Sequence, residues 1–299
     1  MRIVLLLHSV TGNTDLVARY VQRHLAAAGH QVRLVDIRLE PDPKQLEDMD
    51  LLGVASPTMY FRSSFVMDKY LRGLIEPAEP RPAFLLATAA GEPGAHFEGQ
   101  AALLDARGYR ALGAHWVSAP SNWPPQRVVS LPMGLGKGLG RGLARMLPAF
   151  RPMLGLFWPD CTEPQNEDKE ALESFLGRML TSAERGDSEA LMQPLYKPWL
   201  PGAAAAGRRM TPTQASKATA TRIDEKKCSR CGGCVQVCPV ECITWPVGQP
   251  VPQVGSNCVG CWACYHRCPT GAIAGWLSPG GLGQYAGPPE GMRKIFGRH

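Results

Sequence analysis

The feature that most constrains this chain is a cysteine spacing that occurs twice. Cys228-x-x-Cys231-x-x-Cys234-x-x-x-Cys238-Pro239 recurs as Cys258-x-x-Cys261-x-x-Cys264-x-x-x-Cys268-Pro269. Three closely spaced thiolates can bind three corners of a 4Fe-4S cube, and the fourth corner then needs a ligand from elsewhere. In the two-cluster form of this pattern, the last cysteine of each run binds the cluster of the other run. The sequence therefore predicts one cluster on Cys228, Cys231, Cys234 and Cys268, and another on Cys258, Cys261, Cys264 and Cys238.

Zinc and disulfides are the alternatives for these thiols. Paired C-x-x-C units also form tetrahedral zinc sites, but zinc needs four ligands and does not use the third cysteine and the Cys-Pro of each run. A secreted disulfide scaffold usually spreads its cysteines, whereas nine of the ten lie between Cys228 and Cys268. Iron–sulfur clusters are the favoured interpretation. Cys161 and Cys242 lie outside the pattern and are interpreted as packed thiols, with redox sensing as a less favoured role.

The segment around these runs resembles a known domain. Gly232, Gly233 and Gly260 permit tight turns that bring backbone amides toward cluster sulfurs. Residues 223–276 are similar to a bacterial-type two-cluster ferredoxin domain. The resemblance implies a small α+β domain of two pseudo-symmetric halves, each with a hairpin and a short helix.

The N-terminal part has a different pattern. Residues 2–119 alternate apolar runs with amphipathic stretches, as a parallel sheet covered by helices requires. We expect strands at 3–7, 31–36, 51–55, 83–88 and 113–118. Helices are expected between the first two strands and at 65–74, 97–107 and 167–183.

A phosphate-binding loop is predicted where the first strand meets the first helix. The segment runs Ser9-Val-Thr11-Gly12-Asn13-Thr14. Helix-start amides and hydroxyl groups can together hold one phosphate. The segment contains neither a dinucleotide fingerprint nor a nucleotide-triphosphate loop, so a phosphate monoester is favoured.

Two further segments follow the third and fourth predicted strands, at the sheet edge where doubly wound folds bind ligands. They supply further candidate contacts: Pro57, Thr58, Tyr60, Phe61, Thr88, Ala89, Ala90 and Gly91. Together with the phosphate loop they resemble a flavodoxin, although Leu7 stands where an aromatic residue is usual. The resemblance implies a flavodoxin-like, doubly wound sheet of five parallel strands that binds FMN. Tyr60 or Phe61 would stack on the flavin ring; ordinary core packing is the alternative for both.

The predicted domains are residues 1–193, with an insertion at about 120–160, a linker at 194–222, the ferredoxin domain at 223–276 and a Gly/Pro-rich basic tail at 277–299. Within the insertion, Lys137, Arg141 and Arg145 alternate with leucines. A solvated surface segment is favoured there over a docking site for an acidic partner or a membrane.

Composition narrows the function. The formal charge is +6. Each of the two thiolate-ligated clusters, and the flavin phosphate, would contribute about −2. The loaded protein would then be near neutral, which argues against nucleic-acid binding. No apolar stretch is long enough to cross a bilayer, so a cytoplasmic location is expected. No catalytic residue is predicted, because the histidines are scattered.

The combination is similar to the family of flavodoxin-ferredoxin fusion proteins. It implies an electron carrier that relays low-potential electrons between two 4Fe-4S clusters, an FMN and a redox partner protein. The alternatives are an FMN-dependent reductase of a small molecule such as a quinone, and an electron-transfer subunit of a larger redox complex. Whether the chain is a stand-alone enzyme stays open.

Overall fold

The computed structural model describes residues 1–46, 48–130, 162–186, 197, 200, 202–276 and 278–297. The chain forms two compact units. The first unit comprises Met1–Ala119, Glu163–Arg209 and Pro288–His299, and the second comprises Pro120–Thr162 and Met210–Gly287. Cys161 and the basic stretch from Lys137 to Arg145 lie outside the described residues.

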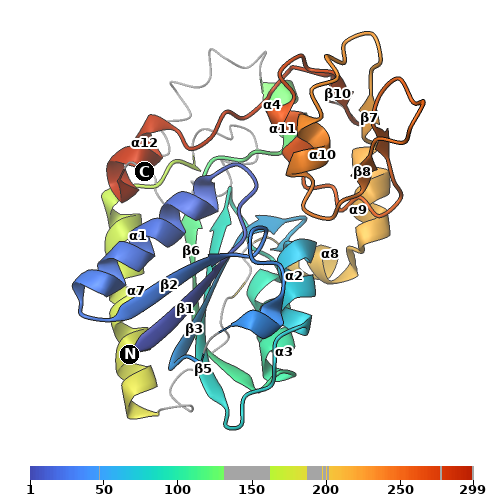
Figure 1. Ribbon diagram of the computed structural model, residues 1–299. Helices are drawn as coiled ribbons and strands as arrows, with labels where there is room; N and C mark the ends of the chain where they lie inside the picture. Colours follow the sequence, from blue (N-terminus) through green and yellow to red (C-terminus); the bar gives the residue numbers. More distant parts are fainter. Residues whose placement is uncertain are drawn as a thin grey trace. The chain divides into compact units, whose positions relative to one another are not determined.

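The first unit contains a sheet of five parallel strands (Figure 1). They are β1 (Arg2–Leu7), β2 (Gln31–Asp36), β3 (Leu51–Met59), β5 (Arg81–Ala89) and β6 (Tyr109–Ser118), in the order β2-β1-β3-β5-β6. This is the flavodoxin-like order of doubly wound sheets, with its switch point between β1 and β3. The predicted fold class is confirmed. The structure adds β4 (Arg62–Ser63), which pairs antiparallel with the end of β3.

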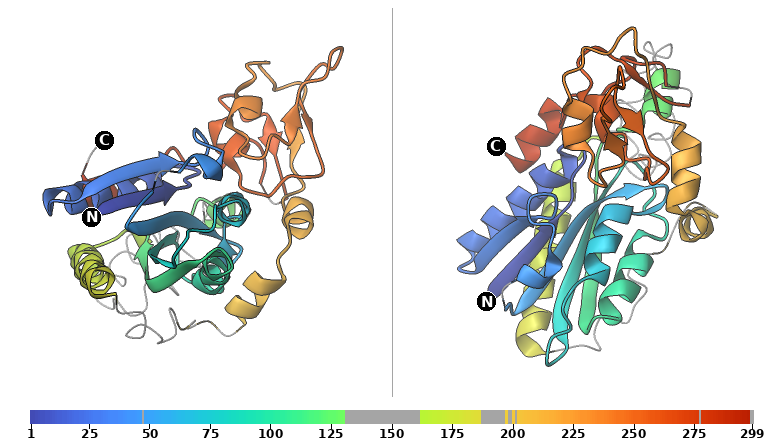
Figure 2. Two further views of the ribbon diagram at one scale, coloured as in Figure 1. Left: turned by 60° about the horizontal axis from the view of Figure 1, so that its bottom comes forward. Right: turned by 45° about the vertical axis from the view of Figure 1, so that its right-hand side comes forward.

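Helices cover both faces of this sheet (Figure 2). Because side chains alternate along a strand, Ile3, Leu5 and Leu7 enter one core cluster while Val4 and Leu6 enter the other. The hydrophobic core that contains Leu5 receives side chains from α1 (Asn13–Ala27), α7 (Asn166–Arg185) and α12 (Glu290–Phe296). The other core receives them from α2 (Phe65–Arg72) and α3 (His96–Asp105). The short helix η1 (Pro43–Gln45) precedes β3.

The C-terminal segment belongs to the first unit. Met292 and Phe296 of α12 are fully buried in the cluster beneath α1. The Phe296 ring meets Tyr20 edge-on at a centroid distance of 5.3 Å, and Arg23 Nη2 donates a hydrogen bond of 2.7 Å to the Phe296 carbonyl. The region interpreted from sequence as a tail thus contains a helix with an apolar stripe that packs in this core.

Helices also occur in the segment that the sequence analysis interpreted as a linker. These are α8 (Ala203–Arg209) and α9 (Pro212–Thr219). Thr211 and Gln214 form a reciprocal capping box at the start of α9. Among the residues that the structure describes, no helix has both the length and the apolar character needed to span a membrane.

The second unit has internal pseudo-symmetry. After α4 (Pro124–Ser130), it pairs β7 (Arg222–Ile223) with β10 (Ile273–Ala274), and β8 (Ile243–Thr244) with β9 (Gln253–Val254). The short helices α10 (Gly233–Val237) and α11 (Ala263–Arg267) occupy equivalent places in the two halves. Each half therefore has the short helix that the ferredoxin resemblance implies, but its two strands pair with strands of the other half and not with each other as a hairpin.

The backbone repeats at the same offset that separates Cys228 from Cys258. Three equivalent positions have positive φ in both halves, and at each of them one half has glycine and the other does not. The pairs are Arg230 (φ 59°) with Gly260 (64°), Gly232 (72°) with Trp262 (63°), and Glu241 (52°) with Gly271 (64°). Three side chains thus occupy a conformation that favours glycine.

Candidate cluster and flavin sites

The first cysteine set surrounds one pocket of the second unit. Its lining includes Cys228, Cys231, Cys234 and Cys268, so it joins three thiols of the first run to the last thiol of the second. Apolar walls come from Ile223 and other residues, namely Pro252, Ala272 and Ile273. Four thiols around a space, instead of around one point, suit a multi-atom cluster. This donor set fits the predicted ligands of the first cluster.

The second set is grouped around Cys264. Burial, followed by the neighbouring thiols of Cys261, Cys258, Cys238 and Cys234, raises the pKa of Cys264 well above its usual value. That Cys238 binds the second cluster stays a prediction. Thiols crowded in this way release their protons when iron binds, because the metal stabilises the thiolate form.

Backbone amides contact the cysteine sulfurs symmetrically. The amide of Cys242 donates to Cys238 Sγ at 3.3 Å, and the equivalent amide of Ala272 donates to Cys268 Sγ at 3.2 Å. Such hydrogen bonds tune cluster potentials. The halves differ in one respect, because the buried Cys242 thiol lies 3.5 Å from Cys238 Sγ where the other half has a methyl group.

The predicted phosphate loop lies at the start of α1. Gly12 adopts φ 97° as the N-cap residue, and α1 begins without a side-chain cap. The Gly12 amide donates to Ser9 Oγ at 3.1 Å, and the buried residues of the loop also include Thr11, Asn13 and Thr14. Hydroxyl groups gathered at an uncapped helix start form an environment that suits a phosphate monoester.

The loop after β5 lies beside the phosphate loop. Thr14 Oγ1 and Thr88 Oγ1 are 2.8 Å apart, so these two predicted segments are brought together. Ala89 and Gly91 are buried and Ala90 is half-buried at the end of β5. The contacts of their amides with a flavin stay a prediction.

The third predicted segment forms a tight aromatic turn. Pairing of Met59 with Arg62 leaves Tyr60 and Phe61 as a two-residue hairpin turn, with φ 54° and 59°. Glycine and asparagine are the usual residues in such a turn, and each strained residue costs about 1 kcal/mol. Both aromatic side chains are half-buried, and the Ala95 amide holds the Phe61 carbonyl at 2.8 Å. Two half-buried aromatic residues at the carboxyl edge of the sheet fit the interpretation that one of these rings stacks on a flavin.

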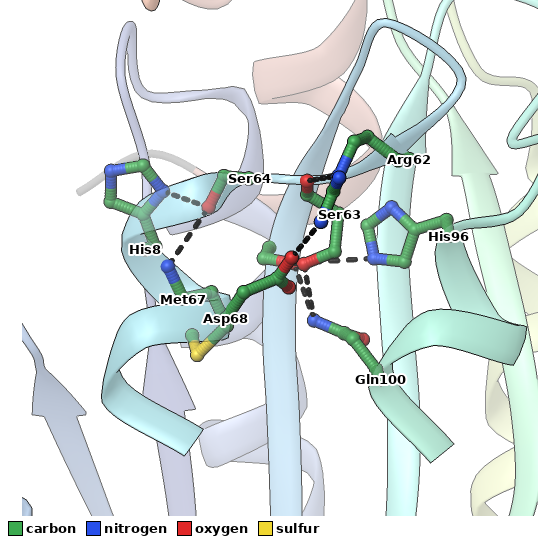
Figure 3. Close-up of polar contacts among 9 residues, drawn as sticks. His8, Arg62, Ser63, Ser64, Met67, Asp68, His96 and Gln100 are labelled. Atoms are coloured by element: carbon green, nitrogen blue, oxygen red, sulfur yellow. Dashed lines mark hydrogen bonds and ion pairs between the residues drawn. The ribbon is translucent and has the colours of Figure 1, made fainter. Parts of the chain in front are cut away.

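Buried polar side chains from β3, β4 and α3, close to this turn in the chain or in the fold, form a hydrogen-bond network (Figure 3). His96 Nδ1 lies 3.0 Å from Thr58 Oγ1, and His96 Nε2 lies 3.2 Å from Ser56 Oγ. Gln100 Nε2 donates to Ser56 Oγ and to Ser63 Oγ, both at 2.9 Å. Burial lowers the pKa of His96 to about 3, so its ring is neutral and can accept one of these bonds.

A second part of the network anchors α2. Arg62 forms an ion pair with the buried Asp68. Ser64 caps α2 by accepting the Met67 amide at 3.2 Å, and His8 Nδ1 lies 2.8 Å from the same hydroxyl. The buried Ser64 hydroxyl therefore serves the helix start and is not placed as an exposed nucleophile.

Sequence reasoning missed this network, because its histidines stand far apart in the chain. His8 follows β1 and His96 starts α3, and only the folded sheet brings them beside β3 and β4 (Figure 3). The sequence contains one weak signal for the network, because Ser56 and Thr58 lie in the segment that is predicted to contact a flavin.

Comparison with known proteins identifies part of the chain. Residues 221–244 match the family model described as a 4Fe-4S binding domain. A search of curated proteins finds no match.

Solved structures that are similar include a flavodoxin from the domain Archaea, with 16% identity over 41% of this chain and 87% of that chain and a TM-score of 0.33. The two-electron reduced flavodoxin of Megasphaera elsdenii has 18% identity over 38% and 85%, with a TM-score of 0.31. An NAD(P)H:quinone oxidoreductase from Methanothermobacter marburgensis has 12% identity over 39% and 81%, with a TM-score of 0.28. The fold assignment rests on the strand order and not on these likenesses.

The chain thus joins a flavodoxin-like domain to a 4Fe-4S ferredoxin domain. The family match indicates a bound iron–sulfur cluster, and the combination indicates a redox role in electron transfer.

Proposed function

We propose that this protein relays low-potential electrons between two 4Fe-4S clusters, an FMN and a redox partner. The observation that carries the proposal is the pocket lined by Cys228, Cys231, Cys234 and Cys268, which brings together thiols from both cysteine runs. A pair of clusters that exchange ligands in this way is held by one small folded unit. Both clusters then lie close enough in the chain's own fold to act as one conduit.

In this proposal FMN binds at the carboxyl edge of the first unit's sheet. The loop from Ser9 to Thr14 holds the phosphate, the segment from Thr88 to Gly91 meets the polar edge of the ring, and Tyr60 or Phe61 stacks on its face. A bound flavin can accept one or two electrons, which links single-electron clusters to other carriers. The protein residues supply position and water exclusion, and the polar network around His96 keeps the aromatic turn in place.

An anaerobic redox titration tests this function. Electron paramagnetic resonance (EPR) of the stepwise reduced protein should show two interacting 4Fe-4S signals and a flavin radical. In a separate rapid-mixing experiment with a low-potential donor, the clusters should be reduced before the flavin. Cluster signals without any flavin response would contradict the relay. Steady-state quinone turnover with the same donor and no added protein would favour the reductase alternative.

A further inference from the structure

The two cysteine sets differ in their exposure. Cys231 is exposed, whereas Cys261, which occupies the equivalent place in the second half, is half-buried; likewise Cys234 is half-buried, and its equivalent Cys264 is buried. The pocket that Cys231 lines therefore has one edge at the surface of the second unit. An electron can leave a buried cofactor only where a partner can approach it, so this edge is a candidate exit.

One cationic residue lines that pocket, and three more are close in sequence to its cysteines. Lys226, Lys227 and Arg230 are exposed and flank Cys228 and Cys231 in sequence, and Arg267 lines the same pocket. We call these four residues the cationic rim. In the described part of the chain, none of the four takes part in a salt bridge with an acidic side chain. Only Asp224 and Glu225 are acidic in the same stretch, which leaves the rim with a net positive charge.

The fold does not require these charges. The pseudo-symmetric positions in the other half are Ser256, Asn257, Gly260 and Val237, all uncharged. Both halves nevertheless build the same turns and helices. The positive charge is therefore a property of the surroundings of the first cluster alone.

Arg230 supplies an independent observation. Its φ of 59° lies in the left-handed region, where the equivalent residue is Gly260. A side chain in this conformation costs about 1 kcal/mol compared with the unstrained backbone. Glu241 and Trp262 share this departure from the glycine preference, and residues held in unfavourable backbone conformations are concentrated at functional sites.

We propose that the cationic rim docks an acidic electron-transfer protein, and that the first cluster, on Cys228, Cys231, Cys234 and Cys268, exchanges electrons with it. Complementary charges raise the association rate of such partners by about 10- to 1,000-fold at low salt. The second cluster, with its more buried ligands, is not the one that meets this partner. This inference rests on the proposed electron-transfer function and adds the chemistry of the partner and the cluster that meets it.

The test compares two variants that remove the same charge. The rim variant is Lys226→Gln/Lys227→Gln/Arg230→Gln. The control variant is Lys69→Gln/Arg72→Gln/Arg110→Gln, which removes three exposed cations from the first unit. Each protein is reduced anaerobically and mixed in a stopped-flow instrument with the anionic complex cobalt(III)-EDTA, with cationic hexaamminecobalt(III), or with an acidic flavodoxin.

Electrostatic steering gives definite expectations. At low ionic strength, the rim variant should react about tenfold more slowly than wild type with cobalt-EDTA and with the acidic flavodoxin, and faster with hexaamminecobalt. Added salt should remove these differences. The control variant should change each rate less than twofold. Equal rates for the rim and control variants would overturn the proposal, and so would wild-type binding to anionic phospholipid vesicles that prevents reaction with the flavodoxin.

A single substitution covers the case in which the rim variant folds poorly. Arg230→Gly should slow the reaction with both anionic partners and, at the same time, raise the resistance of the second unit to unfolding. Faster or unchanged rates in this variant would contradict the docking role. Iron content and the EPR signals, recorded on every sample, separate this failure from a failure of the proposed function, because a chain without clusters would give neither signal nor reaction.

Discussion

Phe296 provides a sharp test of the unexpected place of the C-terminal helix. Its side chain is fully buried in the core of the first unit and meets Tyr20 edge-on at 5.3 Å. Truncation of a buried phenylalanine to alanine costs about 3–5 kcal/mol, a value that includes the cavity left behind. We therefore expect Phe296→Ala to lower the free energy of unfolding of the first unit by about 4 kcal/mol.

Urea unfolding followed by circular dichroism measures this loss. With a slope of about 2–3 kcal/mol per molar urea for a domain of this size, the unfolding midpoint should fall by about 1.3–2 M. The matched control is Lys294→Ala, an exposed residue of the same helix, which should stay within about 0.5 kcal/mol of wild type.

The ferredoxin domain supplies the internal reference. Because α12 belongs to the first unit, the visible absorption and EPR signals of the clusters should persist in Phe296→Ala under conditions that unfold the first unit. An unchanged unfolding midpoint, or clusters lost in parallel with the first unit, would refute the assignment of this helix.

Three more predictions concern single residues. Glu241→Gly should stabilise the second unit by about 0.5–1 kcal/mol in chemical unfolding, because glycine tolerates positive φ. Gly271→Ala, at the equivalent position, should destabilise it by about 2 kcal/mol, because the new Cβ would lie 2.7 Å from the Gly281 backbone. Equal effects of the two variants would contradict the pseudo-symmetric strain. Cys242→Ala removes a thiol beside Cys238 Sγ and should lower the potential of the second cluster by roughly 20–60 mV in an EPR-monitored titration, with no shift of the first. The pKa of His96 is about 3 in the folded protein, against 6.5 ordinarily. The contribution of its neutral ring to the free energy of unfolding is therefore fully present above about pH 6.5, and it falls below that pH because the unfolded chain takes up the proton. His96→Asn should reduce the stability lost between pH 7.5 and 5.5 by about 1.4 kcal/mol in urea unfolding, and an unchanged loss would contradict a buried neutral ring.

Those parts of the fold that depend on repeated local patterns could be predicted from the sequence. Strand β2 has the predicted bounds, because its apolar residues form a distinct run between a helix end and a loop. The spacing of the cysteine runs likewise predicts which thiols bind each cluster; the four thiols of the first set line one pocket, and the ligands of the second cluster stay a prediction.

The remaining features depend on contacts between distant residues or on unusual turn residues. Strand β3 extends beyond the predicted end because β4 pairs with it through a turn made by Tyr60 and Phe61, which lacks the glycine or asparagine that marks such turns. The stretch at 203–206 was interpreted as a linker from its low complexity, although alanine is the strongest helix former. The docking of α12 depends on a contact between Phe296 and Tyr20 that no local window contains.

The most direct test is the cofactor content of protein purified without oxygen. Two clusters held by exchanged ligands, together with a flavin at the phosphate loop, should give about eight irons, about eight sulfides and one FMN per chain. Zinc in place of iron, or only about four irons, would contradict the two-cluster assignment. Full iron in a chain that fails to bind added FMN would leave the ferredoxin domain standing and end the proposed relay.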